Sequence, residues 1–244
     1  MVEIESPLRF SRLECKYVLD GAERERTEAA LAPFLERHGH GREGGCYGVR
    51  SLYFDDPALS AFHAKMDGLR TRSKFRLRTY ARSSEDGAAW FLEQKGRHDG
   101  LVWKHRTPVL GDFDRRARGD ALVAAVLRHA APSPVRDRFE VAVLRRRLAP
   151  LVLVDYRRRP YRSPFAREFR VTFDDHMVAA PSDTVFGPSA APQALLRGCS
   201  VLEIKFAQHV PKWFQAVVQT HELQRRSLSK VCAAILALDL AQAR

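Results

Sequence analysis

The sequence has few cysteines and no long hydrophobic segment. Only four of its 244 residues are cysteines, and none forms a Cys-x-x-Cys pair, which excludes a zinc ribbon or a thioredoxin-type redox site. The longest apolar run, residues 231–238, is far too short to cross a bilayer, and residues 1–14 lack the apolar core of a secretory signal. We therefore expect a cytoplasmic protein with reduced thiols and no transmembrane segment.

Motifs for nucleic-acid binding and for histidine-based metal binding are also absent. The nine histidines form no His-x-x-x-His or His-Glu-x-x-His pattern, and no RNP motif, zinc finger or helix-turn-helix is recognisable. Positive charge is abundant instead: 41 lysines and arginines stand against 29 acidic residues, a net charge of +12. This charge favours a polyanionic partner, such as nucleic acid, anionic lipid or a phosphorylated small molecule. The missing motifs argue against nucleic acid.

Eight segments have the alternation of β-strands, and four have the periodicity of amphipathic helices. The predicted strands are residues 10–19, 47–54, 71–81, 88–97, 101–109, 151–161, 168–174 and 200–206, and the predicted helices are residues 22–38, 120–129, 210–221 and 227–240. An Asp-Gly turn at residues 98–100 predicts a hairpin. Residues 181–192 are typical of a surface loop. We therefore expect a single α+β domain over residues 1–244, with its core at about residues 8–240 and a mainly antiparallel sheet.

The polar faces of these strands carry an unusual excess of cations. Segment 71–81 places Arg72, Lys74, Arg76 and Arg78 on one face, and segment 168–174 places Glu168, Arg170, Thr172 and Asp174 on another. A solvated outer face would explain any single strand. Over eight strands, a closed barrel would bring the charged faces together in a polar, cationic lumen, with the helices covering the outside. Such a lumen is unfavourable unless an anion fills it, and it suits a phosphate chain with a divalent cation.

Eight short motifs occur in the order found in one family. They are RLECKY at residues 12–17, VRSLYFD at 49–55, FRLRTY at 75–80, FLEQKG at 91–96, DYRRRPY at 155–161, RVTFD at 170–174, VLEIK at 201–205 and SK at 229–230. With these motifs the chain resembles the VTC domain, the polyphosphate polymerase domain of the vacuolar transporter chaperone family. That domain belongs to the CYTH-like triphosphate tunnel metalloenzymes.

The resemblance implies an eight-stranded antiparallel tunnel barrel that transfers the ATP γ-phosphoryl group to a growing polyphosphate chain with Mn²⁺ or Mg²⁺. The catalytic candidates are Arg76, Arg78, Lys95, Arg158 and Lys230. The phosphate-binding candidates are Lys16, Arg50, Arg97, Lys104, Arg106, Tyr156, Arg170, Lys205 and Ser229. Glu203 is the expected metal ligand, with Glu14 and Glu93 as possible helpers. Arg97 stands where a histidine is expected, and Arg12 replaces the first glutamate of the ExExK motif of tunnel hydrolases.

Two other readings stay open. The same cations serve water or phosphate as the acceptor, so a hydrolase of tri- or polyphosphate is an alternative to the polymerase. A non-catalytic module that binds polyphosphate or nucleotide is the second. The expected partners are ATP and polyphosphate or another triphosphate, without nucleic acid, and the sequence does not indicate an oligomeric state.

Overall fold

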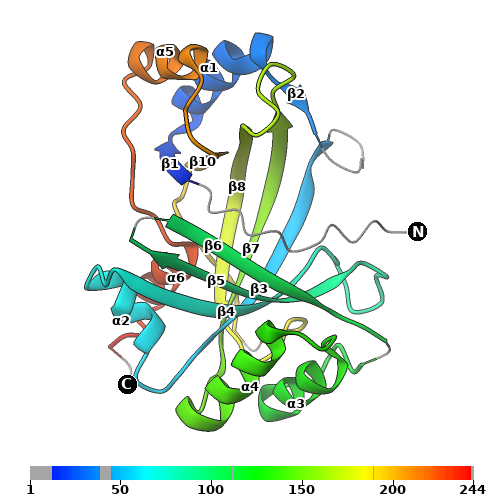
Figure 1. Ribbon diagram of the computed structural model, residues 1–244. Helices are drawn as coiled ribbons and strands as arrows, with labels where there is room; N and C mark the ends of the chain where they lie inside the picture. The colour runs from blue at the N-terminus through cyan, green and yellow to red at the C-terminus, as the bar shows by residue number, and fades with distance from the viewer. Residues whose placement is uncertain (1–12, 39–44, 100, 112, 189, 243–244) are drawn as a thin grey trace.

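The computed structural model describes residues 13–38, 45–99, 101–111, 113–188 and 190–242, and its main feature is an antiparallel sheet (Figure 1). Eight strands follow in the order β1-β10-β8-β7-β3-β4-β5-β6, while the short β2 pairs with β7 and the short β9 with β8. The strands are β1 Leu13–Leu19, β2 Glu36–Arg37, β3 Tyr47–Asp55, β4 Thr71–Thr79, β5 Trp90–His98, β6 Leu101–Val109, β7 Ala149–Arg162, β8 Arg170–Pro181, β9 Gln193–Ala194 and β10 Ser200–Phe206. The predicted combination of helices with an antiparallel sheet is confirmed.

The backbone does not close this sheet into the barrel that we expected. In the described residues, the path of hydrogen-bonded strands ends at β1 on one side and at β6 on the other. A side-chain contact connects β1 instead to β5, the neighbour of the end strand β6, because Nζ of Lys95 on β5 lies 2.9 Å from Oε2 of Glu14 on β1. Backbone pairing needs strands about 4.8 Å apart, whereas two long side chains can span a wider gap. Figure 1 shows β4, β5 and β6 running across the direction of β10, β8 and β7.

Six α-helices and one 3₁₀ turn accompany the strands in the described residues. They are α1 Gly21–Leu31, the 3₁₀ turn Ala32–Phe34, α2 Ser60–Met66, α3 Gly119–His129, α4 Pro134–Arg146, α5 Lys212–Thr220 and α6 Lys230–Ala237. The helix predicted at residues 22–38 is therefore too long. Pro33 lies in the 3₁₀ turn, and residues 36–37 pair with β7 as a strand. Pro33 has no backbone N–H to donate to the carbonyl of Ala29, so the α-helical hydrogen bonds cannot continue past Ala32, which explains the early end of α1.

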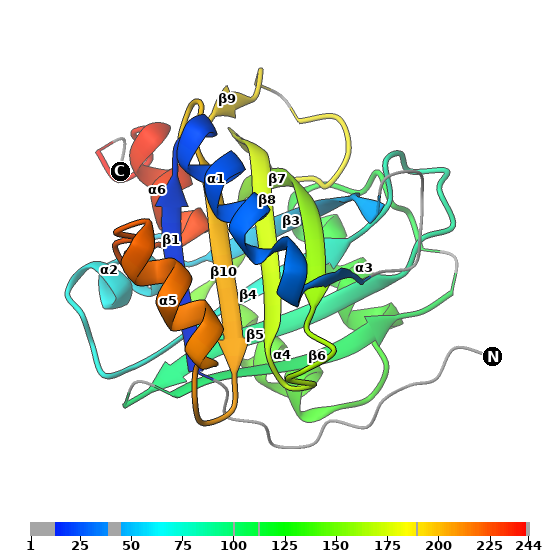
Figure 2. The same ribbon diagram turned by 90° about the horizontal axis from the view of Figure 1, so that it is seen from above.

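Buried apolar side chains lie under the helices in three clusters. Helices α3 and α4 cover one cluster around Leu52, Leu77 and Leu92 of the central strands. Helices α1 and α5 cover a second cluster on β1, β8 and β10 (Figure 2). Helices α2 and α6 cover the third. Because neighbouring residues of a strand point to opposite faces, burial of one set directs the other set away from that cluster.

No helix within the described ranges is both long enough and apolar enough to cross a membrane. Residues 10–12 of the first predicted strand, which include Arg12, and Gly100 of the predicted turn lie outside the described residues. The hairpin itself is confirmed, since His98 of β5 faces Leu101 of β6 in the register.

Candidate functional site

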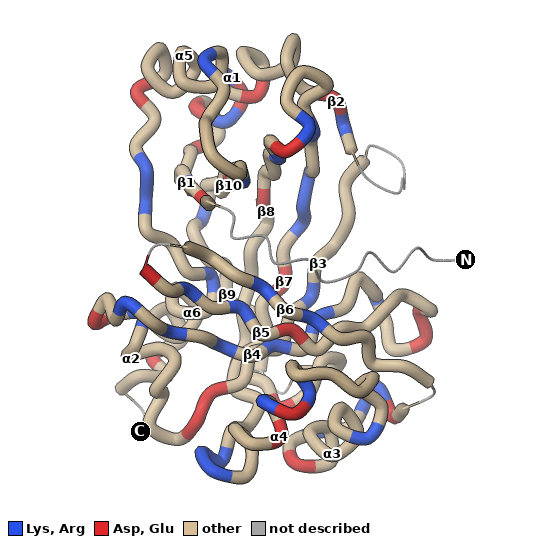
Figure 3. Tube along the Cα trace, in the orientation of Figure 1, with Lys and Arg blue, Asp and Glu red and all other residues tan. Residues whose placement is uncertain are grey.

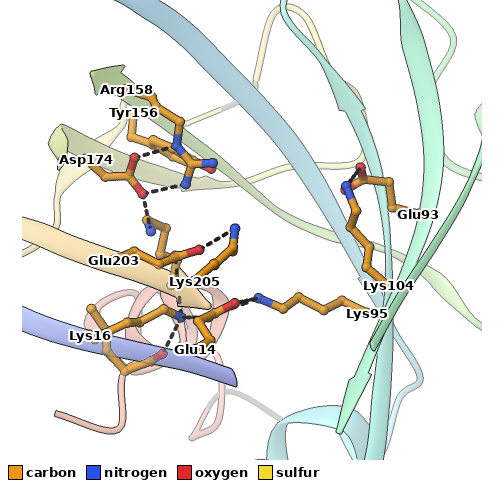
Figure 4. A network of polar contacts seen from close by, with 12 residues as sticks. Glu14, Lys16, Glu93, Lys95, Lys104, Tyr156, Arg158, Asp174, Glu203 and Lys205 are labelled. Atoms are coloured by element: carbon orange, nitrogen blue, oxygen red, sulfur yellow. Dashed lines mark hydrogen bonds and ion pairs between the residues drawn. The ribbon is translucent and has the colours of Figure 1, made fainter. Parts of the chain in front are cut away.

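Charged side chains from seven strands and from α6 form a network that we call the charged cluster. Figure 3 marks the charged residues along the chain, and Figure 4 shows part of the network. Its cations are Lys16, Lys74, Arg76, Arg78, Lys95, Lys104, Arg158, Lys205 and Lys230, and its carboxylates are Glu14, Glu93, Asp174 and Glu203. Because the cations outnumber the carboxylates, the cluster carries net positive charge. A further anion would therefore be stabilised there.

The first part of the cluster lies on β4, β5 and β6, with the carboxylate of Glu93 at its centre. Its side chain is fully buried, and its Oε2 accepts a hydrogen bond of 2.7 Å from Nε of Arg76. Nζ of Lys104 lies 3.3 Å from the other carboxylate oxygen. Although burial alone would raise the pKa of Glu93, the charges of Arg76, Arg78 and Lys104 hold it well below its usual value. Glu93 is thus an ionised counter-ion that fixes these cations.

The two arginines of β4 are also fixed by neutral hydroxyl groups. Arg76 donates a hydrogen bond of 3.1 Å to the hydroxyl of Tyr53. Arg78 donates to the hydroxyls of Ser51 at 3.0 Å and of Tyr156 at 3.1 Å. Ser51 and Tyr53 face Arg78 and Arg76 in the pairing of β3 with β4. The sheet register therefore orients both guanidinium groups.

Glu14 and Glu203 form the second part of the cluster on the adjacent strands β1 and β10. Nζ of Lys16 lies 2.9 Å from Oε1 of Glu14 and 3.9 Å from Oε2 of Glu203, so one ammonium sits between two carboxylates. Lys95 is a second cation in contact with Glu14, and Nζ of Lys205 lies 2.7 Å from Oε1 of Glu203 (Figure 4). Burial opposes ionisation of both glutamates, but the surrounding lysines lower the pKa of each well below its usual value.

Asp174 forms the third part and links β7, β8 and α6. It is fully buried, and Arg158 donates to both of its carboxylate oxygens, at 2.7 and 2.8 Å. Nζ of Lys230 donates to the same carboxylate at 2.7 Å. The sequence placed Asp174 on a charged strand face but did not single it out as a site residue. The available signal was its position two residues after Thr172, which places both side chains on the same polar face of the strand.

The N-terminus of α6 points into the cluster, and its sequence explains why the helix begins there. Ser229 is the N-cap, and its hydroxyl accepts a hydrogen bond from the backbone N–H of Cys232. Nζ of Lys16 donates to the carbonyl of Leu228 at 3.1 Å, and Nζ of Lys74 donates to Oγ of Ser229 at 2.9 Å. The N-cap therefore lies at residue 229 and Lys230 is the first helical residue, so α6 begins three residues later than the predicted segment 227–240.

Other predicted site residues lie at the margin of the cluster or outside it. Arg50 is on the opposite face of β3 from Ser51, in a two-bond salt bridge with Asp155. Arg170 is exposed at the first position of β8. Arg106 is exposed over the ring of Phe91, although it faces Glu93 in the register. Arg97 lies two residues beyond Lys95 on the same face of β5, and Tyr156 lies between Arg78 and Arg158.

The arrangement of Glu14 and Glu203 fits a divalent cation, whereas that of Glu93 does not. The ammonium of Lys16 already occupies a position between Glu14 and Glu203, which shows that the pair accommodates a cation. Both oxygens of Glu93 are engaged by Arg76 and Lys104. Within the described ranges, no group of three or more His, Cys, Asp or Glu residues could hold a metal ion. Phosphate oxygens of a ligand and water would have to complete the coordination.

Burial and neighbouring charges shift the pKa of two lysines and one tyrosine in or beside the cluster. Burial lowers the pKa of Lys95 to about 7 and that of Lys104 to about 8, against the attraction of Glu14 and Glu93. Burial raises the pKa of Tyr53, but the charges of Arg76, Lys74 and Arg78 outweigh it and lower the value to about 8. These directions are expected where positive charge exceeds negative charge in a poorly hydrated site.

The arrangement of an antiparallel sheet with flanking helices also occurs in a solved structure. A solved structure from Bacillus halodurans, named as a candidate adenylate cyclase, is similar with a TM-score of 0.54 and 13% identity, over 90% of this chain and 95% of that one. Protein PH1819 from Pyrococcus horikoshii OT3 has a TM-score of 0.47 and 12% identity, over 95% and 99%. The Mimivirus capping enzyme triphosphatase has a TM-score of 0.35 and 7% identity, over 86% and 88%.

The family model of the VTC domain matches residues 11–239. The chain therefore belongs to the VTC domain family, and the resemblance of its eight motifs is confirmed. No curated protein sequence matches the chain.

Proposed function

We propose that this chain is a metal-dependent phosphotransferase that moves the γ-phosphoryl group of ATP onto a polyphosphate chain. The observation that carries the proposal is the excess of fixed cations over carboxylates in the charged cluster of a VTC domain. Each carboxylate is shared between cations, as Glu93 is between Arg76 and Lys104, so the cluster keeps positive charge for a ligand. A chain of phosphates supplies several negative charges at short spacing.

Phosphoryl transfer requires in-line alignment and charge neutralisation more than a protein nucleophile. The attacking group is a terminal phosphate oxygen of the acceptor, which is already ionised at neutral pH. This oxygen forms a bond to the γ-phosphorus, the bond from that phosphorus to the β–γ bridging oxygen breaks, and ADP leaves. No proton has to be removed from the acceptor. The absence of a catalytic base among the named residues is consistent with this chemistry.

The residues of the cluster would bind and orient the two phosphate groups. Arg76 and Arg78 present planar forks that bind phosphate oxygens with two hydrogen bonds, and their existing contacts hold them in place. Lys16, Lys95 and Lys230 add compact charges. A bound Mn²⁺ or Mg²⁺ would be held by Glu203 and Glu14 and would neutralise charge on the phosphate oxygens. Preorganised charges of this kind stabilise the transition state more than the ground state.

Release of ADP with and without an acceptor tests the proposal and separates it from the hydrolase. The purified chain is incubated with Mn²⁺ and ATP, and ADP formation is measured in the presence and absence of short polyphosphate. A polymerase forms ADP faster when the acceptor is added, without a matching release of free phosphate. A hydrolase releases one phosphate for each ADP and gains nothing from the acceptor. A binding module forms no ADP in either reaction.

A further inference from the structure

Lys74 differs from the other cations of the charged cluster in having no carboxylate partner among the residues that the structure describes. Lysines 16, 95, 104, 205 and 230 each lie within 4.0 Å of a glutamate or aspartate oxygen, and so do Arg76, Arg78 and Arg158. The hydroxyl of Ser229 accepts a hydrogen bond of 2.9 Å from Nζ of Lys74, and the ring of Tyr53 lies 6.0 Å from this atom. An ammonium group has three donors, so two of them lack an acceptor among the described residues.

The surroundings of Lys74 oppose its charge. The side chain is only partly exposed, and the nearby Lys16 and Arg76 have the same sign. Burial, together with these two charges, lowers the pKa of Lys74, and the ionisable groups of Tyr53 and Cys232 offset this only in part. A poorly hydrated cation without a counter-ion is unfavourable. A phosphate oxygen in contact with Nζ would supply both the missing charge and the missing acceptors.

The position of Lys74 lies between two parts of the cluster. Along one face of β4, Lys74 precedes Arg76 and Arg78 at intervals of two residues, which corresponds to about 7 Å per step. Its register partner on β5 is Lys95, which belongs to the Glu14 and Glu203 part. A ligand that extends from the arginines of β4 towards Glu203 therefore passes Lys74. Orthophosphate is too small to contact both the arginines of β4 and Lys74, whereas a chain of phosphates can contact them all.

We infer that Lys74 is a further substrate-binding residue, whose ammonium contacts a phosphate oxygen of the ligand between Arg76 and the N-terminus of α6. This inference rests on the proposed function, because it takes a phosphate chain as the ligand. The bond to Ser229 orients the ammonium towards the cluster. A conservative change that keeps the charge should therefore keep most of the binding, whereas a change that keeps only the length should not.

Calorimetric titration with tripolyphosphate tests the inference without requiring turnover. Lys74→Met should weaken tripolyphosphate binding by about 10-fold or more, the effect of losing one charge-assisted contact. Lys74→Arg should restore binding to within about 3-fold of the unchanged protein. Lys65→Met is the matched control, because Lys65 donates a similar bond of 3.2 Å to Ser227 but is exposed outside the cluster. Its affinity should not change.

Thermal unfolding without ligand separates binding from a structural role. Loss of an unpaired, poorly hydrated cation should leave the melting temperature of Lys74→Met unchanged or raise it. A lowered melting temperature with unchanged tripolyphosphate affinity would show that Lys74 only anchors α6, and it would overturn the inference. If the unchanged protein binds tripolyphosphate and Lys74→Met binds it equally well, the inference fails alone. If the unchanged protein does not bind tripolyphosphate, the proposed function fails with it.

Discussion

Among single residues, Glu203 has the clearest assignment to test. It is 4% exposed and surrounded by lysines, and it shares the ammonium of Lys16 with Glu14. Glu203→Gln removes the charge that would hold the metal while nearly preserving shape. We expect the rate of transfer to fall by about 10²-fold or more, because charge on the phosphate oxygens is no longer neutralised in the transition state.

Steady-state rates over a series of Mn²⁺ concentrations measure this effect. ATP binding should fall less than the rate, since the cations of the cluster remain. Glu85→Gln is the control, because Glu85 is exposed and pairs only with Arg116 at the surface. Full activity of Glu203→Gln at low Mn²⁺ would show that the ligand assignment is wrong.

Tyr53 reports the positive charge of the cluster directly. Its pKa is lowered to about 8, in spite of burial, by Arg76, Lys74 and Arg78. We expect one of the six tyrosines to ionise near pH 8 in an absorbance titration at 295 nm. Tyr53→Phe should remove this step. Tripolyphosphate should move the step to higher pH, because a bound anion offsets the cations that favour the tyrosinate. A titration with no tyrosine ionising below pH 9 would contradict the charge balance described here.

The sequence could predict the charged residues of the strands but not all of their partners. Alternation placed Arg158 on a charged face and Asp174 on another. Their contact depends on a register shift in the pairing of β7 with β8, between Asp155 and Arg157. Such a bulge leaves no reliable signal in one sequence. Arg50 illustrates the opposite case, since alternation alone places it on the other face of β3 from Ser51, where it pairs with Asp155 of β7.

At the scale of elements, the β5–β6 hairpin depends on a close contact between Gly96 and Trp103. A Cβ atom on Gly96 would lie only 2.1 Å from the Trp103 ring, so any side chain forces the indole to move. Gly96→Ala should destabilise the protein by about 1–3 kcal/mol, the usual effect of overpacking. Gly48→Ala is the control, because nothing lies within 4 Å of its added Cβ. Equal melting temperatures for the two variants would contradict the packing of this hairpin.

Helices were predicted well where one face is strongly apolar and less well elsewhere. Segments 120–129 and 210–221 correspond closely to α3 and α5, whose apolar faces are regular. Helices α2 and α4 were not predicted. α2 has only seven residues, and α4 exposes Val141 and Leu144, which obscures its buried face. Ser133 and Pro134 were the available signals for α4, as the N-cap and the first helical residue.

For the whole molecule, the depth of the charged cluster should set its choice of polyanion. Glu93 and Asp174 are fully buried, and the side chains of Arg76, Arg158 and Lys230 that contact them are at most 12% exposed. A flexible phosphate chain can enter such a site. A rigid DNA duplex carries its phosphates on the outside of a wide cylinder and cannot bring them to these groups. Both interactions should weaken as salt increases.

A competition assay at physiological salt measures this preference. Polyphosphate should displace a fluorescent ATP analogue from the protein at concentrations where duplex DNA of equal total charge does not. Equal displacement by duplex DNA would place the binding on a surface patch instead of in the charged cluster.

The sequence predicted the class of the fold, helices with an antiparallel sheet, but not whether the sheet closes into a barrel. Alternating charge over eight strands indicated that the charged faces meet, and the ion pair between Lys95 and Glu14 joins β5 to the end strand β1. Alternation gives the face of a strand on which a residue lies, but not the distance between two strands that are not neighbours in the sheet. Whether backbones or side chains make the contact between β1 and the β5–β6 hairpin could therefore not be predicted.

The most direct test of the account is to identify the phosphorus product made from ATP. The chain is incubated with ATP and Mn²⁺, the metal is then removed by a chelator, and phosphorus NMR spectra are recorded over time. The account predicts that signals of inner-chain phosphate grow as the γ-phosphate of ATP disappears and ADP accumulates, and that Glu203→Gln forms them far more slowly. Orthophosphate as the only new product would contradict phosphoryl transfer to a polyphosphate chain.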